Sequence, residues 1–273
     1  MLQSNHGCCS MDCVGYRGSR SVITLLFSVY KTYSYVQSHF SRTDLMAKKI
    51  QKYPAPAKES NALFLKPLKF RTAAQEYYAQ TLNEATITFC LGPAGVGKTY
   101  IATYIALQHL IEKDVQQIII TKPIIEAADE KLGYLPGEID EKTRPYFEAL
   151  RQNFIQHIGP MKTEDLIKSG KIKFIPAAYL RGMTLQDAFI IVDEAQNLTR
   201  KGVKLITTRL GENSYMCING DENQIDLPKP GDSGFAPAAN ALLGKTSEIQ
   251  VVQFHENDVV RNPLIKTILK HLP

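Results

Sequence analysis

The chain has 273 residues, of which 44% are hydrophobic, and a formal net charge of +5. This length allows one substantial core and leaves little room for two full domains, while the small basic excess is too weak to indicate nucleic acid by itself. Five cysteines in a chain of this length exclude a disulfide-rich secreted class and predict reduced thiols in the cytoplasm.

The first 45 residues differ in composition from the rest. Residues 1–46 contain eight Ser and no Ala, Glu or Pro. The apolar run "VITLLFSVY" falls well short of the ~20 residues that a membrane-spanning helix needs. The cysteines of "CCSMDC" lack zinc-like C-x2-C pairs and are interpreted as incidental thiols rather than as a metal site. We expect a poorly ordered extension over residues 1–45, with a transit peptide or a start at Met46 as alternatives, and a linker over residues 46–61.

Beyond the linker, short β-rich runs alternate with helical patterns. Strands are predicted at 85–91, 115–121, 171–176, 188–193, 214–219 and 249–254. Helices are predicted near 99–111, 144–157, 163–169, 199–210, 233–243 and 262–271. Nearly continuous apolar strands that alternate with helices are typical of a parallel sheet covered on both faces. We therefore predict a single α/β domain over residues 62–273.

The segment that follows "DEAQNL" shows how a helix is read from the residues. Thr199 can cap its start, and Val203, Ile206 and Leu210 fall on one face that would pack on the sheet. Gly211 is predicted to take a left-handed conformation just past the helix end.

The sequence "GPAGVGKT" follows the first predicted strand and precedes the first predicted helix. A loop of this pattern turns backbone N–H groups and a helix N-terminus toward phosphate oxygens. Its lysine can reach the β and γ phosphates, and the hydroxyl after it can ligate Mg²⁺. This context favours a nucleoside triphosphate site over a glycine-rich turn without a ligand. The eight residues are Gly92, Pro93, Ala94, Gly95, Val96, Gly97, Lys98 and Thr99.

Two acids follow the apolar run "FIIV" at the end of a neighbouring predicted strand. Asp193 is predicted to hold the Mg²⁺ ion, directly or through water. Glu194 can orient and deprotonate an attacking water, a group that a simple binding module does not require. The alternative is that both acids only favour the positive end of the following helix.

A third strand end carries "INGDENQIDLP". Here Gln224 is predicted to contact the γ phosphate and to report whether it is still attached. Without the other two motifs, the same residues would be interpreted as a polar turn.

Together, "GPAGVGKT", "TKP", "EKLGYLPG", "AYLRGMTLQDAFIIVDEAQN", "TRLG", "GDENQIDLP" and "DVVRNPLI" resemble the PhoH family of ATPases from about Ala62 to His271. The resemblance implies a P-loop NTPase with a RecA-like, doubly wound, mainly parallel sheet, similar to the first motor domain of superfamily 1 helicases. It also implies ATP as cofactor and assembly into a homo-oligomer, a hexameric ring. The short form is similar to versions found in phages, and the N-terminal nuclease-like domain of some members is not attributed to this chain.

The resemblance also assigns residues. It places the phosphates on Gly92 to Thr99, Mg²⁺ on Thr99 and Asp193, the attacking water on Glu194 and the γ phosphate on Gln224. In the family pattern, Gln75 lies against adenine, whereas by itself it would be interpreted as a surface helix residue. The arginine finger would be Arg261 or Arg209.

The substrate of the ATPase is predicted less directly. Residues 124–147 form a charged insertion in which Tyr134, Lys131, Lys142 and Arg144 could contact a nucleic-acid strand, although its six acids equally favour a solvated structural segment. Single-stranded RNA is the preferred substrate by the resemblance. The alternatives are a non-hydrolysing ATP-binding regulatory protein and a P-loop small-molecule kinase, and Glu194 argues against both.

Overall fold

The structure is a computed structural model that describes residues 64–124 and 139–260. These residues belong to one compact unit, Ala62–Pro273. The predicted extension and linker, most of the 124–147 insertion and the helix near 262–271 lie outside the described residues. None of the helices in the two described ranges is long and apolar enough to cross a membrane.

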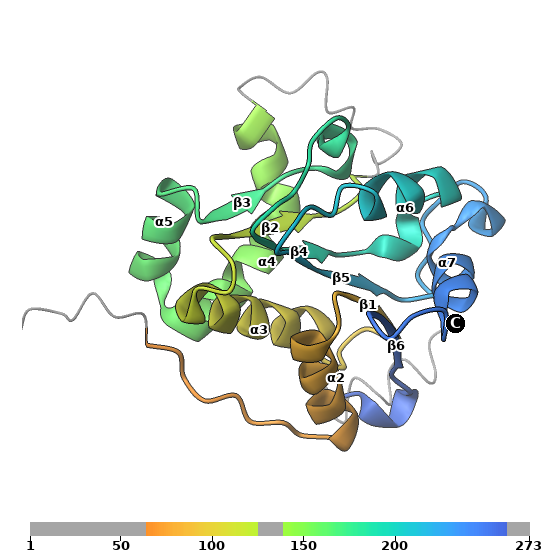
Figure 1. Cartoon of the computed structure of the whole chain (residues 1–273), viewed down its shortest axis with the longest axis horizontal. Helices are drawn as coiled ribbons and strands as arrows, with labels where there is room; N and C mark the ends of the chain where they lie inside the picture. Colours follow the sequence, from red (N-terminus) through yellow and green to blue (C-terminus); the bar gives the residue numbers. More distant parts are fainter. Residues whose placement is uncertain (1–63, 125–138, 261–273) are drawn as a thin grey trace, which may run out of the picture. The chain divides into compact units, whose positions relative to one another are not determined.

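A six-stranded parallel sheet forms the centre of this unit (Figure 1). Its strands lie in the order β3-β2-β4-β5-β1-β6, and every neighbouring pair is parallel. The prediction of an α/β fold with a parallel sheet is therefore confirmed, as are all six strands. The strands are β1 Ile87–Leu91, β2 Gln117–Thr121, β3 Ile172–Phe174, β4 Ala188–Val192, β5 Tyr215–Gly220 and β6 Ile249–Gln253.

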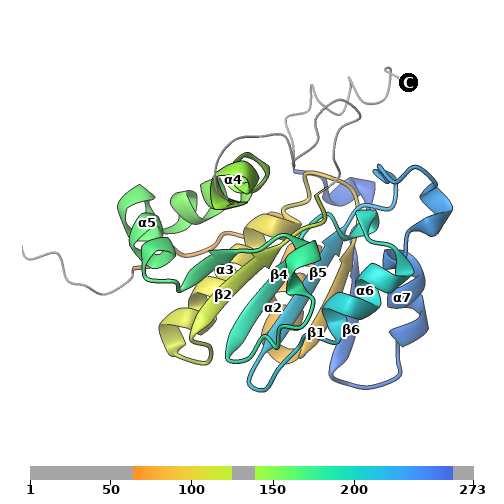
Figure 2. The same ribbon diagram turned by 90° about the horizontal axis from the view of Figure 1, so that it is seen from above.

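Helices cover both faces of the sheet (Figure 2). On one face lie α2 Ala73–Glu84, α3 Lys98–Glu112, α4 Ile139–Ile158 and α5 Pro160–Lys168. On the other lie α6 Arg200–Thr207 and α7 Phe235–Leu242. The helix α2 is absent from the sequence-based prediction, because its buried side includes the polar residues Gln75 and Thr81, which obscure the apolar stripe.

The strands are apolar throughout because both faces are buried. In β2, Ile118 and Ile120 pack under α3 and α4, while Ile119 packs on the opposite side with Val203 of α6. A strand buried on both sides cannot show the alternation of a half-exposed one. Burial on both faces therefore explains the near-continuous apolar runs of the sequence.

The helix α6 confirms one end of its prediction and corrects the other. Thr199 caps its start by accepting a hydrogen bond from the Gly202 N–H at 3.2 Å. The helix ends at Thr207, and Gly211 does not have a positive φ. Gly211 is instead required by a close approach, because a Cβ there would lie 2.8 Å from the carbonyl oxygen of Leu185.

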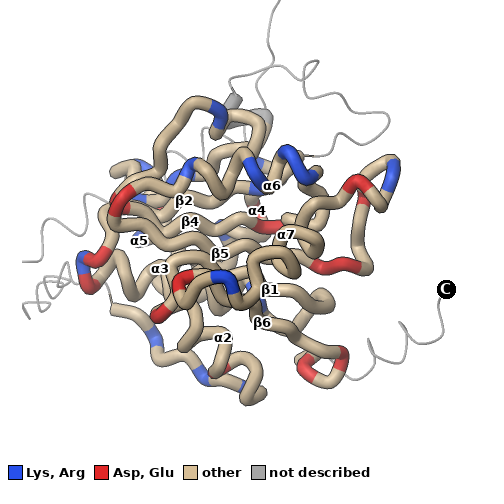
Figure 3. Tube along the Cα trace, turned by 45° about the vertical axis from the view of Figure 1, so that its right-hand side comes forward, with Lys and Arg blue, Asp and Glu red and all other residues tan. Residues whose placement is uncertain are grey.

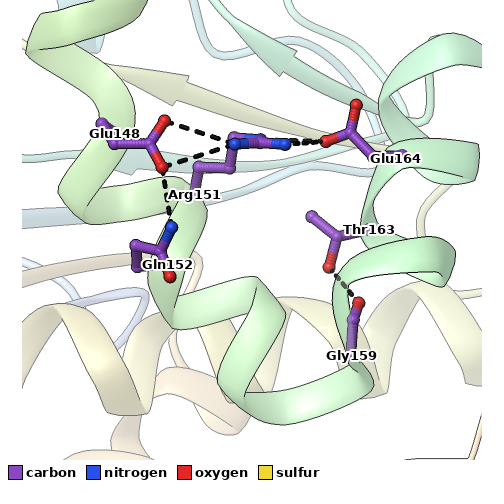
Figure 4. A network of polar contacts seen from close by, with 6 residues as sticks. All are labelled: Glu148, Arg151, Gln152, Gly159, Thr163 and Glu164. Atoms are coloured by element: carbon purple, nitrogen blue, oxygen red, sulfur yellow. Dashed lines mark hydrogen bonds and ion pairs between the residues drawn. The ribbon is translucent and has the colours of Figure 1, made fainter. Parts of the chain in front are cut away.

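An ion-pair network fixes α4 against α5 (Figure 4). Arg151 of α4 donates from Nε to Glu164 of α5 at 2.9 Å, and its Nη1 lies 3.3 Å from Glu148. On its other side, α4 is joined to α3 by His157, whose Nε2 donates to the carbonyl of Tyr100 at 3.0 Å. These contacts hold α4 over the first turn of α3.

Candidate nucleotide-binding site

The loop from Gly92 to Gly97 connects the carboxyl end of β1 to the start of α3. Gly97 has a φ of +90°, a left-handed conformation that favours glycine. Gly92 has a φ of +148°, and a Cβ there would lie 2.6 Å from the Cβ of Phe254. The loop therefore turns sharply against β6 at its start, and its helix begins directly at Lys98.

Lys98 closes over the loop that precedes it. Its Nζ donates to the carbonyl oxygens of Gly92 and Pro93 at 2.7 and 2.9 Å. An ammonium held at the mouth of a loop rich in N–H groups supplies the positive charge that a polyphosphate requires.

Thr99 and Asp193 meet where α3 begins and β4 ends. The Thr99 hydroxyl donates to Asp193 Oδ1 at 2.9 Å. Burial, and then the neighbouring charge of Glu194, raise the pKa of Asp193 to about 6. A hydroxyl and a carboxylate are oxygen donors of the kind that Mg²⁺ prefers, so this pair fits the ion that the sequence predicts.

Glu194 begins the short helix η3, Ala195–Asn197, in a left-handed conformation with a φ of +53°. A non-glycine residue in this conformation is strained and requires support from its surroundings. The support comes from Gln196, whose Nε2 donates to Glu194 Oε2 at 2.6 Å and to the Gln224 carbonyl at 2.9 Å. Gln196 is only 1% exposed, so its amide fixes both groups from below the surface.

The end of β5 contributes a third group of polar residues. Asp221 is buried, and its Oδ2 accepts a hydrogen bond from the N–H of Ala94 in the loop at 2.9 Å. The Asp221 N–H in turn donates to Gln196 Oε1 at 3.1 Å. One strand, β5, separates β1 from β4, so its end ties the glycine loop to the two acids.

These elements surround a cavity of about 360 Å³. The cavity brings together Lys98, Thr99, Asp193, Glu194 and Gln224, which the sequence predicts from three separate motifs. It is also lined by Ala94, Gly95, Gly97, Tyr100, Asn153, Gln196, Asn219, Gly220 and Asp221. Among the described residues, no cluster of three or more His, Cys, Asp or Glu side chains could form an all-protein metal site.

Gln75 is not a surface residue, so that interpretation of the bare sequence is wrong. It is 5% exposed, and its Nε2 donates to the carbonyl of Val96 in the glycine loop at 2.8 Å. Its Oε1 accepts from the N–H of Arg71 at 2.8 Å. In this arrangement Gln75 fixes the loop backbone, and its contact with adenine stays a prediction.

Of the two candidate arginine fingers, Arg209 alone lies within the described residues. Arg209 follows α6, and its backbone carbonyl accepts from the N–H of Leu185 ahead of β4. Its Nη1 donates to the Met183 carbonyl at 3.2 Å, so Arg209 lies toward the amino end of the sheet and does not line the cavity of its own chain. Arg261 lies outside the described residues.

Sequence reasoning missed several polar residues of the cavity, among them Gln196, Asp221 and Asn153. The sequence does carry a signal for Gln196 and Asp221, because each lies within four residues of an apolar strand end and within three residues of a predicted site residue, Glu194 or Gln224. Asn153 had none, because it comes from the middle of α4 and only the packing of that helix brings it to the cavity.

A sequence profile of the family described as PhoH-like protein matches residues 67–272. PhoH-like proteins of Bacillus subtilis and Synechocystis sp. are 42% and 40% identical over 205 and 203 residues, which are 75% and 74% of this chain. The chain matches 64% and 61% of their lengths, less than two thirds of each.

Among solved structures, a large terminase of a thermophilic bacteriophage aligns with a TM-score of 0.45 and 14% identity. The alignment covers 74% of this chain and 50% of the terminase. The profile match and the two relatives, together with the glycine loop at the end of β1, identify the chain as a P-loop protein that belongs to the PhoH-like protein family.

Proposed function

We propose that the chain hydrolyses ATP with Mg²⁺. The observation that carries the proposal is the position of Glu194 in the same cavity as Lys98, Thr99 and Asp193. A protein that only binds a nucleotide requires the last three, whereas hydrolysis requires in addition a group that accepts a proton from water.

Each residue then has a role. The N–H groups of Gly92 to Thr99 and the ammonium of Lys98 bind the phosphates, and Thr99 with Asp193 would hold Mg²⁺, which neutralises charge on the phosphate oxygens when it is bound. Glu194 orients the water and takes its proton, and Gln224 contacts the γ phosphate. ATP is favoured over other triphosphates by membership of the family, in whose pattern Gln75 lies against adenine.

The proposal extends to assembly and substrate. The described residues form one core with one glycine loop, so we place the arginine that closes over the γ phosphate, Arg261 or Arg209, on a neighbouring subunit of a homo-oligomeric ring. Single-stranded RNA is the proposed substrate. The chain matches less than two thirds of the length of its relatives. Ring assembly and the RNA substrate are therefore proposals, supported by the family and by the need for an arginine at the γ phosphate.

Turnover of ATP without any acceptor tests the proposal. Phosphate release should depend on Mg²⁺ and disappear in Lys98→Ala, which removes a phosphate-binding charge and leaves the core intact. ATP binding without phosphate release would instead support a regulatory binding protein. Release of ADP only after a small-molecule acceptor is added would support a kinase.

A further inference from the structure

The helix α6 has one buried face and one cationic face. Val203 and Ile206 are 4% and 1% exposed and pack against the sheet. Arg200, Lys201 and Lys204 are exposed, and the helix contains no acid. Lys201 and Lys204 are three residues apart, so they lie side by side on the surface of the helix.

The loop between β3 and β4 extends this cationic face. Its short helix η2, Ala177–Leu180, packs against α6 through buried Ala177 and Leu180. Between them, the side chain of Tyr179 is 50% exposed, and the chain continues through exposed Arg181 to Met183, which is 38% exposed. The hydrogen bond from Arg209 to the Met183 carbonyl joins this loop to the end of α6. We call these residues the α6–η2 face: Tyr179, Arg181, Met183, Arg200, Lys201 and Lys204.

The charges of this face are not neutralised within the described part of the chain. The three ion pairs found there belong to α3, α4 and α5, and the side chains of Arg181, Arg200, Lys201 and Lys204 make no hydrogen bond to a described residue. Figure 3 shows Lys and Arg on α6 and no Asp or Glu. Solvated cations are common on protein surfaces, but here the loop that packs against α6 also exposes an aromatic ring and a methionine, which a solvated face does not need.

We propose that the α6–η2 face binds single-stranded nucleic acid, with backbone phosphates on Arg200, Lys201 and Lys204 and a base stacked on Tyr179. A row of cations attracts a polyphosphate backbone whatever its sequence. An exposed aromatic ring provides a stacking surface for a base that is not paired. The inference rests on the proposed action on nucleic acid and adds the surface that carries it.

The position of the face connects it to the nucleotide cavity. The helix α6 begins four residues after Gln196, and its cap Thr199 forms a β-bridge with Ser233. The Ser233 hydroxyl donates to the Gln196 carbonyl at 2.7 Å. A nucleic-acid strand bound at Arg200 would therefore contact the helix that begins four residues after Gln196, and Gln196 is the residue whose amide donates to Glu194.

Binding of a labelled oligouridine RNA to the full chain, measured by fluorescence anisotropy over a range of salt, tests the inference. The double variant Lys201→Ala/Lys204→Ala should bind about tenfold more weakly, and its salt slope should fall by ~1.4, or ~0.7 for each lost phosphate contact. The matched control is Lys168→Ala/Lys171→Ala, which removes two exposed lysines of α5 and the turn before β3 and should bind as the wild type does.

Tyr179 tests the stacking contact separately from charge. Tyr179→Ala should weaken binding by about tenfold, the scale of one lost base–aromatic stack, while Tyr179→Phe keeps the ring and should retain the affinity. The ring is half-exposed, so neither change should alter the thermal midpoint, which is measured in parallel.

Several outcomes would overturn the inference. The wild type would bind no RNA, or the two double lysine variants would lose the same RNA affinity. Tighter binding of duplex RNA than of single strands would also contradict it. So would displacement of the labelled RNA by polyglutamate as effectively as by unlabelled RNA of equal charge. Single-stranded DNA in place of RNA shows which sugar is preferred, and binding of either supports the face. Because the assay needs no hydrolysis, a chain that binds RNA but releases no phosphate would overturn the ATPase proposal alone.

Discussion

The amide of Gln196 lies 2.6 Å from the carboxylate of Glu194 and donates to it. The same nitrogen reaches the carbonyl of Gln224 at 2.9 Å, so the end of β4 and the loop after β5 share one buried donor. A carboxylate fixed by such a bond has one preferred orientation. Gln196 is therefore a positioning residue for the proposed general base.

Gln196→Ala should lower kcat for ATP hydrolysis by about tenfold or more and leave the KM for ATP nearly unchanged, because the variant frees Glu194 while Lys98 and Thr99 keep their contacts. Steady-state kinetics separate the two parameters. The matched control is Gln80→Ala, which removes an exposed glutamine that donates to Glu84 at 2.8 Å. Equal kcat in both variants, with both folded by circular dichroism, would remove Gln196 from the mechanism.

Glu194→Gln should bind Mg²⁺-ATP as tightly as the wild type and hydrolyse it about a hundredfold more slowly or worse, the usual cost of losing a general base. Equilibrium binding of a fluorescent ATP analogue and single-turnover hydrolysis measure the two effects. Glu212→Gln, at an exposed glutamate away from the cavity, controls for charge. Normal hydrolysis in Glu194→Gln would transfer the role of base to another group.

Asp193 should make the nucleotide-free chain less stable as pH rises. Its folded-state pKa of about 6 exceeds the ordinary value near 3.9, so the folded state binds more protons than the unfolded state between these values. The free energy of unfolding therefore decreases from about pH 4 to about pH 7 through this group. Asp193→Asn should stabilise the chain by about 1–2 kcal/mol at neutral pH and by almost nothing near pH 4.

Urea unfolding at both pH values, in EDTA, measures this effect. Asp165→Asn, at an exposed aspartate of α5, should show no such difference. If Asp193→Asn is destabilising at neutral pH, the carboxylate is compensated in the folded chain and the pKa direction is wrong. With Mg²⁺ and ATP the order should reverse, because only the wild-type carboxylate can hold the ion.

Gly92→Ala should destabilise the chain by about 1–3 kcal/mol, because the added Cβ meets the Cβ of Phe254 at 2.6 Å and the site is already well packed. Nucleotide affinity should fall with it, since relief of the clash moves the loop away from β6. Gly231→Ala, where a Cβ would meet nothing within 4 Å, is the control. Wild-type stability in Gly92→Ala would show that the start of the loop can shift without cost.

The finger should act between subunits. Arg261→Ala should nearly abolish hydrolysis, because an arginine at the γ phosphate is worth about a thousandfold or more. When Lys98→Ala and Arg261→Ala subunits are dissociated and reassembled together, some Arg261→Ala sites receive Arg261 from a neighbour, and activity should partly return.

A second mixture, of Lys98→Ala and Arg209→Ala subunits, distinguishes Arg261 from Arg209 as the arginine finger. Recovery only with Arg209→Ala would identify Arg209 as the finger in trans. No recovery with either variant, despite demonstrated subunit exchange, would contradict a finger between subunits.

The local features of this protein could be predicted from its sequence. "GPAGVGKT" determines a turn and a helix start, because its glycines permit conformations that other residues avoid. The apolar runs determine strands buried on both faces, and the alternation with helices determines a parallel sheet. The sequence also placed Asp193 and Glu194 next to the glycine loop, because the carboxyl ends of parallel strands share one edge of the sheet.

Only the tertiary structure decided which residues support these groups. Gln75 has the pattern of a surface residue, yet the packing of α2 against α3 buries its amide on the Val96 carbonyl. Asn153 reaches the cavity because the Arg151 network holds α4 across α3. Such contacts join residues far apart in the chain, and their geometry depends on how whole helices pack, which no local pattern of residues records.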